Sequence, residues 1–189
     1  MERRVMWQPW TGRGLESLRL VEDTDGVRVD SVVIGMDEGR PFSTRYAIRC
    51  DAAWHVRDLE IADLGGRSTT LALASNGMGR WTDGSGAHLP ALDGCLDVDL
   101  SATPFTNTLP IRRLALAPGW ATEITVVYVE VPLLRVGVAR QRYRCLTWGA
   151  PGGSYRFETA AGDFTADITV DADGLVVEYP KIARQVWTS

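Results

Sequence analysis

The chain has 189 residues, of which 45% are hydrophobic and 23% charged, so it suits one globular domain spanning residues 1–189. Its net charge of −4 argues against nucleic-acid binding and against a polybasic membrane anchor, because both functions need a basic surface. No apolar run approaches the roughly 18 residues of a transmembrane helix, and the first ten residues lack the apolar run of an export signal.

Three cysteines, Cys50, Cys95 and Cys145, occur without a CxxC spacing. Their odd number and the lack of an export signal favour reduced thiols, so we expect a cytoplasmic protein.

Hydrophobic residues alternate with polar ones in short runs separated by Gly, Asp and Asn turns. In chain order, these runs lie at residues 18–20, 27–34, 45–50, 59–61, 71–73, 96–100, 124–131, 140–145, 155–157, 168–170 and 175–179. The run Ile124–Val131 is apolar on both faces, as in a central buried strand, and the turn Asp171–Gly174 marks the clearest hairpin. The pattern predicts an all-β barrel, sandwich or rolled meander. Only short helical turns are expected, near Asp51–His55 or Thr108–Arg113.

The segment Arg80–Leu114 concentrates Trp, Asp, Thr, Asn and paired Arg in a predicted strand-loop-strand unit, which marks it as a binding region. Asp97 and Asp99 share one face of a strand, about 7 Å apart. Such a pair could be the acid and base of glycoside hydrolysis, could form ion pairs with neighbouring Arg residues, or could bind a ligand through hydrogen bonds.

Pro104 and Pro110 bracket a loop rich in hydroxyl and amide groups, including Thr106 and Asn107. These groups bind neutral polyols well, although they also stabilise loops through local hydrogen bonds. In a strand, Arg112 and its neighbour Arg113 point to opposite faces, so at most one of them can face a given pocket.

Trp54 and Trp81 lie beside polar clusters and are the better pocket candidates among seven tryptophans, because indole rings stack on sugars and pack on lipid tails. His55 is a possible general base. No metal-binding or phosphate-loop motif occurs, so we expect no metal and no cofactor.

The run GCLDVDLSATPFTNTLPIRRL resembles the signature of the bacterial family described as putative glycolipid-binding. Further pieces agree in order along nearly the whole chain: GLESLRL, YAIRCDAAW, the Arg80-Trp81 element, RYRC and DGLVVEYP. The resemblance implies a many-stranded antiparallel meander rolled on itself, a spiral β-roll with few or no helices. It also implies a likeness to lipoprotein carriers, whose half-barrel holds acyl chains.

We therefore expect a non-catalytic binding protein for a glycolipid or similar small amphiphile held in the cavity of the roll. The expected ligand-binding residues are Trp81, Asp97, Asp99, Thr106, Asn107 and Arg112, followed by Arg45, Arg49 and Trp54. Two alternatives stay open. One is a sugar-active enzyme that uses Asp97, Asp99 and His55. The other is a structural or interaction domain whose core is filled by its own side chains.

Overall fold

A computed structural model describes residues 1–66 and 69–189 of the chain, and fourteen strands of these residues form one sheet. The strand order is β7-β6-β5-β4-β3-β2-β1-β14-β13-β12-β11-β10-β9-β8. The strands are β1 (Glu2–Pro9), β2 (Leu15–Asp23), β3 (Gly26–Asp37), β4 (Arg40–Cys50), β5 (Val56–Asp63), β6 (Thr70–Ser75), β7 (Trp81–Asp83), β8 (Asp97–Leu100), β9 (Ala121–Glu130), β10 (Arg135–Gly149), β11 (Gly152–Thr159), β12 (Thr165–Asp171), β13 (Val176–Tyr179) and β14 (Ala183–Thr188).

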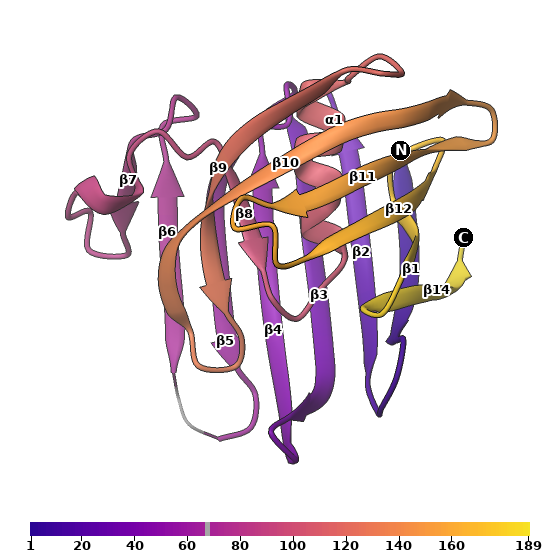
Figure 1. Cartoon of the computed structure of the whole chain (residues 1–189). Coiled ribbons are helices and arrows are strands. Elements are labelled where there is room, and N and C mark those ends of the chain that lie inside the picture. The colour runs from indigo at the N-terminus through magenta and orange to yellow at the C-terminus, as the bar shows by residue number, and fades with distance from the viewer. Residues whose placement is uncertain (67–68) are drawn as a thin grey trace.

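The sheet is a meander that rolls over itself without closing. β1 pairs with both β2 and β14, so the two ends of the chain meet in the middle of the sheet, while β7 and β8 form its edges. Figure 1 shows β9–β12 crossing over the layer made by β1–β6, with the helix α1 (Thr108–Leu114) between the two layers. The predicted all-β roll with few helices is confirmed. One pairing differs from an antiparallel meander, because β8 runs parallel to β9.

Alternation of side chains gives the first layer its buried face. In β2, Leu18 and Leu20 point inward, while Arg19 points outward and donates to Glu2 of the neighbouring β1 at 2.8 Å. The turn to β3 ends at Gly26, whose φ of +126° and close approach to the Cys50 carbonyl leave no room for a Cβ.

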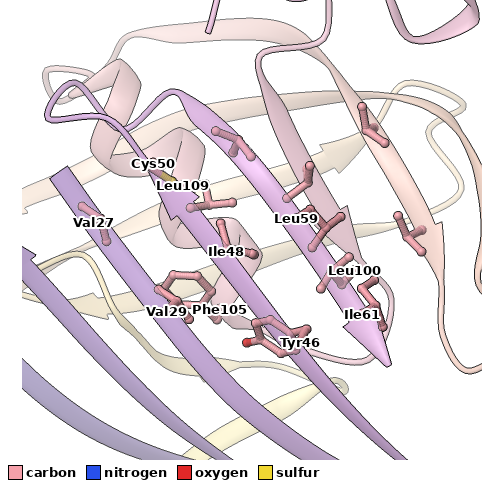
Figure 2. Packing of buried hydrophobic residues seen from close by; sticks show 14 of the residues in the cluster. Val27, Val29, Tyr46, Ile48, Cys50, Leu59, Ile61, Leu100, Phe105 and Leu109 are labelled. Carbon is pink, nitrogen blue, oxygen red and sulfur yellow. The ribbon is translucent and has the colours of Figure 1, made fainter. Parts of the chain in front are cut away.

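We call residues 101–114 the corner segment, because it turns the chain from β8 back into the space between the layers. It contains a short 3-10 helix, Phe105–Asn107, followed by α1. Phe105 and Leu109 pack against the first layer, among Val29 and Ile48 (Figure 2). Ile111 packs against the aromatic residues of the second layer. The corner segment therefore fills much of the interior of the roll.

The helix corrects the predicted strand-loop-strand reading of Arg80–Leu114 and confirms the predicted helical turn near Thr108–Arg113. A strand between two layers has no partner for its backbone groups, whereas a helix satisfies its own. Pro110 is tolerated because it lies in the first turn, where backbone N–H groups have no partner within the helix. Arg112 and Arg113 thus lie on a helix and not on opposite faces of a strand. The other expected helical turn, Asp51–His55, is a turn without helix.

No helix of residues 1–66 and 69–189 is long and apolar enough to cross a membrane.

Candidate functional site

Two cavities lie beside the corner segment, and both are bounded by Ser101, Thr103 and Ile182. The larger cavity has a volume of about 590 Å³ and lies against β9–β11 of the second layer. The smaller cavity has a volume of about 340 Å³ and lies against β1–β3 of the first layer. The corner segment thus divides the space within the roll into two cavities and does not fill it completely.

Aromatic side chains line one wall of the larger cavity. Phe157, Phe164 and Tyr179 contact one another edge to face, with ring centroids 6.0 to 6.1 Å apart. Tyr128 and Ile182 extend this apolar lining. A volume of this size with mainly apolar walls is typical of sites for small molecules.

Two acidic residues, Asp99 of β8 and Asp163, line the larger cavity, and Asp99 is the one that contacts the corner segment. Its carboxylate accepts hydrogen bonds from Thr106 Oγ1 at 2.9 Å and from Gln141 Nε2 at 2.6 Å. Within the part of the chain that the structure describes, no basic side chain pairs with it. Burial raises the pKa of Asp99, although these two hydrogen bonds oppose the rise.

Asn107 lines the same cavity from within the corner segment. Its Oδ1 accepts from the Tyr143 hydroxyl at 2.8 Å, and its Nδ2 donates to the Pro104 carbonyl at 3.2 Å. The amide is therefore held rigidly, with a polar edge beside the cavity.

Glu16 is the buried acidic group of the smaller cavity and is only 3% exposed. Its Oε1 accepts three hydrogen bonds, from Ser31 Oγ at 2.8 Å, Tyr46 OH at 2.5 Å and Thr103 Oγ1 at 2.9 Å. Its Oε2 is buried without a partner. Desolvation raises the pKa of Glu16 to about 7, against the effect of the three hydroxyl donors.

Glu16 is not among the residues expected from the sequence, although the pattern of β2 contains a signal for it. Positions 16, 18 and 20 alternate on the inner face of β2, so an acidic residue shares the face of Leu18 and Leu20. Gln141 shows the same anomaly, because it lies on the inner face of β10 with Tyr143 and Cys145. A polar residue in the register of an apolar face is the pattern that points to both residues.

Among the expected ligand-binding residues, Asp99 and Asn107 line the larger cavity, and Thr106 holds Asp99 in place. Asp97 lies apart from both cavities and is fully buried. Arg113 donates to both of its carboxylate oxygens, with Nη2 to Oδ2 at 2.6 Å and Nε to Oδ1 at 3.0 Å. Asp97 therefore anchors α1 to β8.

The two expected tryptophans and Arg112 are part of the packed structure. Trp81 is fully buried, and its indole N–H donates to the Cys95 carbonyl at 2.8 Å. The Arg112 guanidinium stacks on the Trp54 ring, 4.7 Å from its centroid, and pairs with Glu22 at 3.1 Å. This group joins α1 to β2 at a point away from both cavities.

The remaining candidates lie away from the two cavities. Arg45 pairs with Asp30 at 2.5 Å, and Arg49 donates to Asp58 at 2.7 Å, both between exposed side chains of neighbouring strands. His55 contacts Asp51 within its own turn at 3.3 Å. None of these three residues lines either cavity beside the corner segment in the described ranges.

Comparison with known proteins gives one family and one solved structure. Residues 4–185 match the family described as "Putative glycolipid-binding". A crystal structure of a DUF1089 family protein from Pseudomonas aeruginosa is similar to the chain with a TM-score of 0.83 and 38% sequence identity, over 95% of each chain. No curated protein matches the sequence.

Proposed function

We propose that this chain, which belongs to the putative glycolipid-binding family, binds a small amphiphile such as a glycolipid in its larger cavity. The apolar part of the ligand packs on Phe157, Phe164 and Tyr179. Its hydroxylated head group reaches Asp99 and Asn107. The chain acts as one binding unit and not as an enzyme.

The observation that carries this proposal is the pairing of an aromatic wall with a carboxylate that has only neutral partners. Asp99 accepts from a hydroxyl and an amide, and no cation contacts it within the described residues, since Arg140, which also lines the cavity, pairs with Glu123. A charge that is partly withdrawn from water and has no counter-ion lowers stability. Sugar hydroxyl groups are neutral hydrogen-bond donors. A bound sugar would therefore add donors to the Asp99 carboxylate, which has only two in the free protein.

The two alternatives are less well supported. The corner segment does pack the interior, as a filled core would require, but it leaves about 590 Å³ beside its polar residues. A glycosidase pair of Asp97 and Asp99 would lose one member to the ion pair between Asp97 and Arg113.

Calorimetric titration with n-octyl β-D-glucopyranoside, below the concentration at which it forms micelles, tests the proposal. Methyl β-D-glucopyranoside and 1-octanol supply the head group and the tail separately. We expect the complete amphiphile to bind more tightly than either part. Equal affinity for octanol, or no binding by any of the three, would overturn the assignment.

Two variants locate the binding site. Phe164→Ala should weaken binding of octyl glucoside at least about tenfold, because it removes part of the apolar wall, and Asp99→Asn should do so by removing the charged acceptor. The matched controls are Trp120→Ala, which truncates an aromatic residue that is 70% exposed, and Asp58→Asn on the outer face. Wild-type affinity in both site variants would show that the ligand binds elsewhere.

We further propose that this binding takes place in the bacterial cytoplasm. All three cysteines are free and buried, as is usual for thiols in a reducing compartment.

A further inference from the structure

One carboxyl oxygen of Glu16, a side chain that lines the smaller cavity, accepts no hydrogen bond from the protein. Three hydroxyl donors converge on Oε1 of Glu16, while Oε2 of the same carboxyl has no partner. Leaving a buried carboxylate oxygen without a donor costs free energy. Oε2, the oxygen without a partner, belongs to a side chain that lines a cavity of about 340 Å³.

The surroundings of Glu16 offer it no cation within contact distance. Tyr46 from β4, Ser31 from β3 and Thr103 from the corner segment face it with neutral hydroxyl groups. Arg13 also lines the cavity but forms no ion pair with Glu16 in the described part of the chain, and the other charged residue there, Asp37, is itself an acid. All hydrogen-bond partners of the Glu16 carboxyl are therefore neutral, as they are for Asp99 in the other cavity.

The cavity has room for a group much larger than a water molecule. A water molecule occupies roughly 30 Å³ in the liquid, so a volume of 340 Å³ also suits a group the size of a sugar ring. Trp7, Val33 and Phe42 give it apolar walls. The combination of such walls with a few polar groups, Glu16 among them, is typical of a ligand site.

We propose that the smaller cavity is a second ligand site, in which Glu16 Oε2, covered in the free protein, turns toward the cavity and accepts a hydrogen bond from a hydroxyl or ammonium group of a small polar ligand. Thr103 borders both cavities and holds Glu16 through its hydroxyl group. The site uses none of the residues assigned to the aromatic wall or to Asp99. It therefore stands or falls independently of amphiphile binding in the larger cavity.

Amide chemical shifts in ¹H-¹⁵N spectra test this site with two probes, methyl β-D-glucopyranoside for the hydroxyl source and ethanolamine for the ammonium source. We expect at least one probe to shift the amides of Glu16, Val33 and Ala102. Glu16→Gln should weaken that probe at least about tenfold. The glutamine keeps an oxygen for the three hydroxyl donors and replaces only the open acceptor with an N–H group. Glu60→Gln, the same change at an exposed position of β5, is the matched control.

Wild-type protein supplies a test that needs no variant. An ammonium group cannot pair with a protonated carboxyl, so ethanolamine should bind at least about tenfold more tightly near pH 8.5 than near pH 5.5. The glucoside should depend less on pH, because a hydroxyl group can also accept from the protonated acid. This difference identifies the source of the donor.

The proposal is overturned if neither probe shifts the amides around Glu16, or if Glu16→Gln binds the probes as the wild type does. The amides of Phe157 and Phe164 report on the larger cavity in the same spectra. Shifts there with octyl glucoside, without any shift around Glu16, would leave amphiphile binding standing and remove the second site. The opposite pattern would remove amphiphile binding alone.

Discussion

Replacing Glu16 with glutamine should change how the stability of the protein depends on pH. The pKa of this buried carboxyl is about 7 in the folded protein, compared with about 4.5 when it is solvated. The native state therefore holds the proton more tightly than the unfolded state does. The stability that this group contributes is fully present below about pH 4.5 and is lost as the pH rises through 7.

The size of the effect follows from that difference in pKa. A pKa difference of one corresponds to about 1.4 kcal/mol. Raising the pH from about 5 to about 8 should therefore lower the free energy of unfolding of the wild type by about 2.5 kcal/mol through the ionisation of Glu16. Glutamine has no proton to lose and still accepts from Ser31, Tyr46 and Thr103. The free energy of unfolding of Glu16→Gln minus that of the wild type should therefore grow by about 2.5 kcal/mol over this range.

Urea denaturation followed by tryptophan fluorescence, repeated across the pH range, measures this difference. Asp99 also has a raised pKa, but it is present in both proteins, so its contribution cancels. Glu60→Gln should stay within about 0.5 kcal/mol of the wild type throughout, as surface substitutions usually do. A difference that is constant with pH, or that grows as the pH falls, would refute the raised pKa of the buried Glu16 carboxyl.

Three further predictions concern the packed groups. Arg113→Met should destabilise the protein by about 3 to 5 kcal/mol in urea denaturation, because it leaves the Asp97 charge buried without its partner; a loss below 1 kcal/mol would contradict this reading. Tyr143→Phe should cost about 1 to 3 kcal/mol in the same assay, since Asn107 Oδ1 loses its buried donor, and the Tyr143→Phe, Asn107→Ala double variant should show non-additive costs. The three cysteines should react with a thiol reagent only after unfolding, because all are buried and burial raises the pKa of Cys95 to about 11; prompt labelling of the native protein would show that this packing is wrong.

Much of the fold follows from the period-two pattern of the sequence, because burial on one face of a strand fixes that pattern directly. The hairpin at Asp171–Gly174 is confirmed by the antiparallel pair β12 and β13. The parallel pairing of β8 with β9 was not predictable in this way. The alternation of apolar and polar residues in a strand is the same whether its partner strand runs parallel or antiparallel to it. The helix α1 could be expected only as one of two possible helical turns. Its seven residues are too few for a helical period to be recognised in the sequence.

The candidate site was harder to predict, because the role of a buried polar residue depends on partners that are distant in sequence. Asp97 and Asp99 look alike in an alternating strand. Arg113 neutralises Asp97, while Gln141, 42 residues beyond Asp99, gives it only a neutral donor. Glu16 depends in the same way on Thr103, 87 residues away. Composition and spacing do not contain these pairings.

The three carboxyl groups of the interior, Asp97 and Glu16, which are buried, and Asp99, which is half-buried, differ in the groups that compensate their charge. Asp97 has the Arg113 guanidinium on both oxygens and lies apart from the cavities. Asp99 and Glu16 have only neutral donors, carry raised pKa values, and each lines one of the two cavities beside the corner segment. A carboxyl that served stability alone would be expected to have a partner like Arg113, because a neutral environment penalises its charge. Departures from the rules of packing are expected at functional sites. Their coincidence with empty volume is therefore the strongest physical reason to look for ligands in both cavities.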